Sequence, residues 1–296
     1  MEIRANMVND VSDVKLKYKK KISSSERRNL WMSRIVLWFM MILVLFPIIA
    51  VTGASLSKGS SFTQSSLLPK EITFDNYKNV ITNTNFLIWM KNSLIVCIAS
   101  AVVQLSIVIP AAFAFSKLKF MFRSKGLMAL LILQMFPTAM ALPAILRIAY
   151  NHNGMDNLLV VILLMCTGIA YNIWLMKGYM DGIPSDLMEA AYVDGATTFQ
   201  VFIKIIFPLI KNMMIVIFLF SFINAYSEFM ISSALLKDSA AQTLAVGMQS
   251  FINEKFSSNW TQYSAAAIMA SLPVVILFMS FQKFIAGGLT AGAVKG

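Results

Sequence analysis

Long apolar blocks separated by short polar stretches dominate the pattern of the chain. Six of them have the length that a helix needs to cross the hydrocarbon core of a bilayer. They are Ile35–Ala54, Trp89–Phe115, Gly126–Leu146, Leu158–Met176, Leu209–Leu236 and Ser264–Phe284. Pro110, Pro137, Pro143 and Pro273 fall inside these blocks, where kinked helices are tolerated if neighbouring helices cover the freed backbone. We therefore expect an all-α membrane protein with six transmembrane helices.

The polar stretches divide the chain into three parts. Residues 1–34 form a basic tail, residues 35–286 a six-helix membrane domain, and residues 287–296 a glycine-rich tail. A basic region before an apolar one also describes a signal peptide, but the first block is longer than the apolar region of a signal. We therefore interpret it as an uncleaved span.

Composition and charge agree with a multi-pass protein of the cell membrane. Of 296 residues, 58% are hydrophobic and 13% charged, whereas soluble domains carry about 25% charged residues. The net charge is +11, and the basic residues concentrate in the first tail and in alternate polar stretches. Cytoplasmic segments are enriched in Lys and Arg in this way, which places both termini in the cytoplasm. The same placement argues against nucleic-acid binding. We interpret the tail as a solvated segment that sets the topology, and contact with the anionic headgroups of membrane lipid is the alternative.

The polar stretch 177–208, between the fourth and fifth blocks, predicts two short helices. Pro184 and Ser185 are typical of a helix start. Gly195 is placed where a residue of positive φ would end that helix, and Thr197 begins the next one. The first helix should present one narrow face of Leu187, Ala190 and Ala191. A small helical projection at the membrane surface suits insertion into a groove on another protein, although an ordinary connector is the alternative.

Motifs of catalysis are absent from the sequence. No Gly-Lys dipeptide occurs, so the phosphate-binding loop of ATPases is missing, and HExxH, CxxC and GxSxG are missing too. Cys97, Cys166 and His152 have no metal-ligand spacing. We expect no catalytic residue, no metal site and no enzyme activity.

A transport path would need polar groups inside the apolar blocks. The candidates are Gln104, Gln134, Asn172, Asn224, Tyr226 and Glu228. An acid within a span is a functional hypothesis by default, but Glu228 lies near the outer end of its block. It could line an outer vestibule, pair with a partner subunit or reach water.

Residues of the 177–208 stretch resemble the "EAA" loop of ABC importer permeases. The match comprises Glu189-Ala190-Ala191, Gly195 after three further residues, and Ile205–Pro208. The resemblance implies a type I ABC importer permease fold and a loop that docks into a cytoplasmic ATPase. The coupling residues it implies are Pro184, Leu187, Glu189, Ala190, Ala191, Asp194, Gly195 and Pro208. ATP and Mg would be bound by that ATPase and no cofactor by this chain.

Further segments resemble the smaller permease subunit of maltose-type importers. They are Thr73–Tyr77, which in that family begins a short helix, Gln134–Pro137, Leu244–Gln249 and Gly288–Gly296. The resemblance implies a second homologous permease, two ATPase subunits and an extracytoplasmic sugar-binding protein as partners. The implied contacts with the binding protein are Phe251, Asn253, Glu254, Lys255, Phe256 and Trp260. The implied contacts of the C-terminal tail with the ATPase are Thr290, Gly292 and Lys295.

The resemblance favours an oligosaccharide as the substrate, with a maltodextrin-like sugar first. Galacto-, raffinose-type and acidic oligosaccharides remain open, and no sugar ligand is assigned because the partner permease holds the deep site in several relatives. An ion-coupled secondary transporter is a weaker alternative, since no internal repeat is evident and only Glu228 is acidic within a span.

Overall fold

A computed structural model of the chain describes residues 23–59, 69, 71–252 and 259–290. The described residues are helical apart from turns and one isolated bridge between Ser57 and Ile72. They fall into two compact units, Met1–Ala50 and Val51–Gly296.

Helix α2, Ser24–Ser55, makes up the described part of the first unit and enters the second. It begins eleven residues before the predicted span at Ile35, so the end of the basic tail is helical. The reason is a capping box, in which the Ser23 amide donates to the Glu26 carboxylate (2.8 Å) and the Glu26 amide to the Ser23 hydroxyl (3.2 Å). Its apolar side chains from Leu30 to Ile49 are exposed on all sides, as on a helix that faces lipid or another subunit.

The second unit contains the remaining described helices. In chain order they are α3 Asp75–Asn83, α4 Phe86–Lys117, α5 Arg123–Gln134, α6 Thr138–Asn151, α7 Leu158–Met165, α8 Ala170–Asp181, α9 Asp186–Val193, α10 Thr198–Val201, the π-helix η2 Phe202–Ile206, α11 Phe207–Leu209, α12 Lys211–Tyr226, α13 Met230–Leu235, α14 Leu244–Gly247, the 3-10 helix η3 Met248–Phe251 and α15 Trp260–Thr290. The short helix expected near Thr73–Tyr77 is confirmed by α3.

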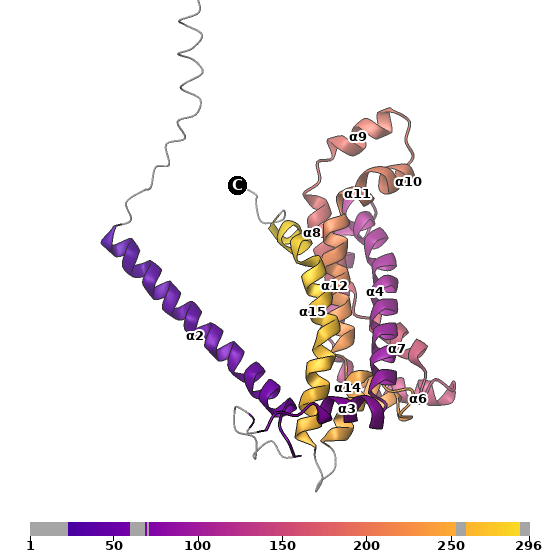
Figure 1. Cartoon of the computed structure of the whole chain (residues 1–296). Coiled ribbons are helices and arrows are strands. Elements are labelled where there is room, and N and C mark those ends of the chain that lie inside the picture. Colours follow the sequence, from indigo (N-terminus) through magenta and orange to yellow (C-terminus); the bar gives the residue numbers. More distant parts are fainter. Residues whose placement is uncertain (1–22, 60–68, 70, 253–258, 291–296) are drawn as a thin grey trace, which may run out of the picture. The chain divides into compact units, whose positions relative to one another are not determined.

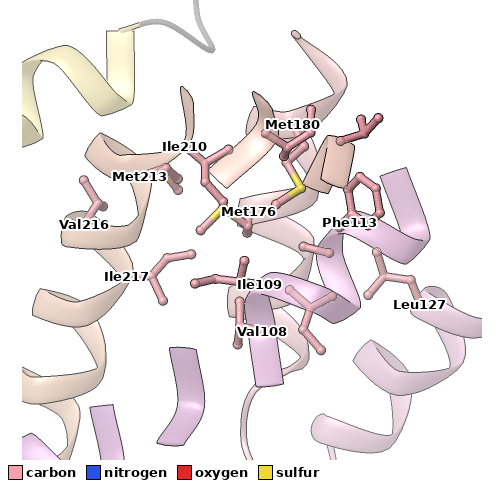
Figure 2. Packing of buried hydrophobic residues seen from close by; sticks show 14 of the residues in the cluster. Val108, Ile109, Phe113, Leu127, Met176, Met180, Ile210, Met213, Val216 and Ile217 are labelled. Atoms are coloured by element: carbon pink, nitrogen blue, oxygen red, sulfur yellow. The ribbon is translucent and has the colours of Figure 1, made fainter. Parts of the chain in front are cut away.

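Four long helices form the centre of this unit. Helix α4 packs against α8 and α12, and α12 packs against α15 (Figure 1). Helices α4, α8 and α12 share a cluster of buried side chains, to which Val108 of α4, Met176 of α8 and Ile217 of α12 belong (Figure 2). Helices α9 and α10 lie at one end of this group, and α3 and α14 lie at the other (Figure 1). These two ends are called the α9 end and the α3 end below.

Two of the predicted spans, the third and the fourth, are bent helix pairs, and a further bend joins the end of the predicted 177–208 loop to the helix of the fifth span. The bends are 80° between α5 and α6, 48° between α7 and α8, and 74° between the α10–α11 segment and α12. Pro137, the residue before α6, has no amide to continue α5. By length and composition three helices can cross a membrane, or up to six if each bent pair is one span. The six-span topology thus stays a prediction for the described part of the chain.

Two helices differ in length from the apolar blocks that contain them or that they contain. Within the block Leu209–Leu236, which was expected to contain the fifth span, α12 ends at Tyr226 and a separate helix, α13, follows. The sixth predicted span, Ser264–Phe284, lies inside the longer helix α15, which runs from Trp260 to Thr290. Hydropathy shows which residues can lie in a membrane but does not place the ends of the helices.

Candidate functional site

The loop between α8 and α12 has the helix–turn–helix form that its sequence predicts. Gly195 has φ +83°, and the turn is closed by hydrogen bonds from the Gly195 amide to the Tyr192 carbonyl (3.0 Å) and from the Ala196 amide to the Ala191 carbonyl (2.9 Å). This pair of bonds is a Schellman motif, in which the residue of positive φ lets the chain reverse directly after a helix. The motif fixes the direction in which α10 leaves α9.

Of the two predicted helix starts in the loop, the one at Thr197 is confirmed with its cap and the one at Ser185 lacks a side-chain cap. Ser185 precedes α9, but its hydroxyl makes no capping bond there. Thr197 does cap α10, and Gln200 completes a capping box with bonds of 3.3 and 2.8 Å. Met188 and Val201 are buried in the central cluster of the unit, so both short helices rest on the core.

The outer surface of the loop is apolar and exposed. Val193 is 88% exposed, Phe199 71% and Leu187 46%, an unusual set for side chains that face water. Of the predicted narrow face, Leu187 and Ala190 are exposed but Ala191 packs towards the core. Four further predicted coupling residues, Pro184, Glu189, Asp194 and Pro208, are exposed. Sequence reasoning missed Val193 and Phe199, although both are large apolar residues next to the turn.

The loop is tied to the end of α4 by a polar cluster. Lys177 and Asp181 form an ion pair of 2.6 Å one turn apart on α8. The other oxygen of Asp181 accepts a hydrogen bond from the Ser116 hydroxyl (2.7 Å), and the Lys117 ammonium donates to the Ile183 carbonyl (2.8 Å). Because these contacts join the loop to both helices, a force on the loop would act on the ends of α4 and α8.

A second polar cluster lies inside the helical group. Gln104 of α4 accepts hydrogen bonds at one oxygen from Ser221 of α12 (2.8 Å) and Asn172 of α8 (3.3 Å). The Asn172 amide also donates to the Ser221 hydroxyl (3.2 Å), and the Gln104 amide donates to the Met165 carbonyl (2.9 Å). All three side chains are buried. The cluster joins α4, α8 and α12, and it was only partly predicted because Ser221 was not among the candidates.

This cluster borders a cavity of about 500 Å³. Four of the six predicted path residues line it, namely Gln104, Gln134, Asn172 and Asn224. Gln134 bridges the break between α7 and α8, since it donates to the Gly168 carbonyl (2.9 Å) and accepts from the Tyr171 amide (3.2 Å). The described lining carries amides, hydroxyls and aromatic rings and no charged side chain.

The other two predicted path residues have structural partners. Tyr226 donates to the Ala270 carbonyl (2.7 Å) and stacks on Phe222 with ring centroids 5.8 Å apart. The Glu228 carboxylate accepts from the amides of Ile231 (2.6 Å) and Ser232 (3.0 Å) at the start of α13. Neither lines the cavity described above. Glu228 is a helix cap, a role that its position four residues before Ser232 permits but hydropathy cannot reveal.

The predicted contacts for the binding protein and the tail are only partly visible. Phe251 is buried and its ring meets Trp89 edge-on at 6.3 Å, so it is no surface contact. Trp260 is 39% exposed and starts α15, whose last residue is Thr290. The other predicted contacts lie outside the described residues: Asn253, Glu254, Lys255, Phe256, Gly292 and Lys295.

A metal centre has no support in the described part of the chain, where no group of three or more His, Cys, Asp or Glu residues could hold an ion. Apolar helices of membrane-spanning length, an exposed apolar loop and an open, uncharged cavity are typical of a membrane transport subunit. Comparison with known families gives the class directly. Residues 22–290 match the family described as "Binding-protein-dependent transport system inner membrane component", and the chain belongs to this family.

Curated relatives cover almost the whole chain. It is 35% identical over 268 residues to the galactooligosaccharides transport system permease protein GanQ of Bacillus subtilis (89% of this chain, 95% of GanQ). It is 36% identical over 258 residues to the maltodextrin transport system permease protein MalD of Streptococcus pneumoniae (86% and 91%). It is 34% identical over 297 residues to the maltose/maltodextrin transport system permease protein MalG of Escherichia coli K12 (92% and 98%).

Solved structures share the fold. A chain of a bacterial ABC transporter involved in the import of the acidic polysaccharide alginate superposes with a TM-score of 0.76 at 26% identity, covering 90% of this chain and 99% of that one. A chain of an alginate ABC transporter in complex with an alginate pentasaccharide-bound periplasmic protein gives 0.67 at 14% identity, which shows the fold alone.

Proposed function

We propose that the chain is a translocation subunit of an ATP-driven importer for a neutral oligosaccharide, of which a maltodextrin is the first candidate. An extracytoplasmic binding protein delivers the sugar, a second permease completes the path, and two separate ATPase subunits bind the α9 end. The α3 end faces the binding protein, and both termini are cytoplasmic.

The observation that carries the proposal is the exposed apolar surface of the α9–α10 loop on a rigid base. Exposure of the Phe199 and Val193 side chains to water costs free energy, and a protein cleft that covers them removes that cost. The loop is braced on α4 and α8 through Lys117, Ser116 and Asp181. A force on the loop would therefore reach the helices that border the cavity.

The choice of a neutral sugar rests on the cavity and on the relatives. Its described lining offers amides and hydroxyls, which match sugar hydroxyl groups, and offers no cation for a sugar carboxylate. The maltodextrin and maltose permeases are 34–36% identical to this chain. A galacto-oligosaccharide is the second candidate, because the permease GanQ is similar at 35% identity.

Sugar-stimulated ATP hydrolysis tests the proposal. The chain is reconstituted in liposomes with its partner permease, ATPase and binding protein, and hydrolysis is measured with maltotetraose, a galactotetraose and an alginate tetrasaccharide. We expect stimulation by maltotetraose and none by the alginate sugar. Stimulation by the galactotetraose alone would move the assignment to the second candidate. Uptake that continues without the ATPase would reject the ATP-driven importer in favour of ion coupling.

A further inference from the structure

A groove separate from the polar cavity lies between α5 and α8 at the α9 end. It has a volume of about 560 Å³ and is lined by Phe120, Arg123, Leu127, Met128, Leu131, Trp174 and Lys177. Its lining combines two basic residues with five apolar or aromatic ones. Arg123 begins α5, and Lys177 lies in the last two turns of α8, while the other lining residues after Arg123 are apolar or aromatic.

The turn that leads into the groove combines cations with exposed apolar side chains. Between Lys117 and Lys125 the sequence has four basic residues and no acidic one. Met121 is 88% exposed and Phe122 62%, and Phe120 at the groove itself is 42% exposed. Alternation of basic and large apolar residues on a surface is typical of segments that lie at the boundary between acyl chains and anionic headgroups.

The chemistry of this groove matches one class of ligand. A phosphodiester needs cationic donors, and acyl chains need an apolar channel that continues from the same point. Trp174 is half exposed and stacks on Tyr171 at 6.1 Å, as aromatic rings do at a membrane interface. Lys177 is paired with Asp181, whereas the Arg123 guanidinium has no ion pair within the described residues and donates to the carbonyls of Phe115 and Ser116.

We propose that this groove binds one anionic phospholipid of the leaflet on the α9 side, with its phosphate between Arg123 and Lys177 and an acyl chain along Leu127, Leu131 and Trp174. The site joins the start of α5 to the end of α8, directly beside the Ser116–Asp181 contact that supports the α9–α10 loop. A bound lipid would therefore stiffen the base of that loop. The membrane side named here rests on the proposed function, but binding itself can be tested without transport.

Native mass spectrometry of the full-length chain in a neutral detergent tests the site. Phosphatidylglycerol and phosphatidylcholine with identical chains are offered together, and bound lipid is counted. We expect one phosphatidylglycerol retained in preference to phosphatidylcholine, and Lys177→Gln to weaken it about fivefold, the usual effect of one basic residue near an anionic headgroup. The matched control is Lys119→Gln, which removes the same charge from an exposed side chain outside the groove and should leave the affinity unchanged.

Four results would overturn the proposal. Equal binding of the two lipids would remove the anionic preference, and equal weakening by both variants would show only diffuse attraction. Displacement by inorganic phosphate would identify a site for a free anion instead of a lipid. A last measurement uses the complex with the partner permease: the difference between wild type and Lys177→Gln must persist there, because its loss would show that a subunit covers the groove. Unfolding temperatures of both variants confirm that each is folded.

Discussion

At two positions the structure strongly favours glycine over any other residue type. At Gly195 the constraint is the positive φ of +83°, because a Cβ there would meet nothing within 4 Å. At Gly247 the constraint is space, because a Cβ would lie 2.1 Å from the ring of Trp89. That ring is 3% exposed and its indole N–H donates to the Ser239 carbonyl (2.8 Å), so it cannot move aside. The first glycine shapes the α9 end and the second the α3 end.

Gly195→Ala should loosen the α9–α10 turn without unfolding the chain. A non-glycine residue in the left-handed region costs about 1–2 kcal/mol, which corresponds to roughly fivefold or greater acceleration of amide exchange at the turn. Hydrogen exchange of the Ala196 amide measures it. Gly178→Ala is the matched control, since its Cβ is equally free of contacts but its φ is ordinary and Ala favours the helix. Equal exchange in the two variants would contradict the account.

Gly247→Ala should destabilise the α3 end by overpacking. We expect a loss of about 1–3 kcal/mol in the free energy of unfolding, from denaturant titration in detergent. In a Trp89→Leu background the same substitution should cost much less, because the obstructing ring is gone. If its cost were the same in both backgrounds, the contact with Trp89 would not be its cause.

At the scale of elements, the long helices are held in register by few polar contacts in an apolar setting. The side chain of Gln104 connects α4 to α8, to α12 and to the Met165 carbonyl at the end of α7. The α7–α8 break is bridged by Gln134 in the same manner. These amides set where bent helices meet, so they belong to the framework of the cavity as well as to its lining.

Gln104→Leu should be the most costly change in this cluster. It removes the acceptor shared by Asn172 and Ser221 and the donor to Met165, and a buried polar group left unpaired costs about 1–3 kcal/mol. Ser221→Ala should cost less, because Asn172 can still donate to Gln104. The control Ser106→Ala on the same helix removes an exposed hydroxyl and should stay within about 0.5 kcal/mol. Unfolding of all three in one detergent gives the order, and a larger loss for Ser221→Ala would refute it.

Helix content and the α9–α10 loop could be predicted from the sequence because local signals determine them. Gly195 requires a special φ, and Thr197 with Gln200 forms a local capping box. The bend between α7 and α8 and the end of α12 at Tyr226 could not be predicted, since each lies within a largely apolar block and no proline marks it. Glu228 was read as an intramembrane charge because its capping bonds to α13 depend on a backbone break that hydropathy does not register.

For the whole molecule, the two ends of the second unit differ in how the chain is built there. The α9 end presents exposed apolar side chains on a helix–turn–helix loop that is braced on α4 and α8. The α3 end also has exposed apolar side chains, such as Phe74, but its segments are joined by polar contacts such as those of Asn92 with the carbonyls of Ala240 and Gln242 (both 2.9 Å). Between them lies an uncharged cavity bordered by the helices that carry the loop. This arrangement suits a subunit that is driven from one end and loaded with substrate from the other.

Co-purification of the ATPase subunits tests the central claim, which is that they bind the α9 end. Phe199→Asp and Phe74→Asp each place an acid at an equally exposed phenylalanine, 71% and 70% respectively. Phe199 lies in α10 and Phe74 directly precedes α3, and these two helices lie at opposite ends of the unit (Figure 1). Loss of a well-packed aromatic anchor costs about 2 kcal/mol or more of binding energy. Phe199→Asp should therefore lower the yield of bound ATPase at least about tenfold while Phe74→Asp leaves it unchanged. Full retention of ATPase by Phe199→Asp, or its loss with Phe74→Asp instead, would contradict the account.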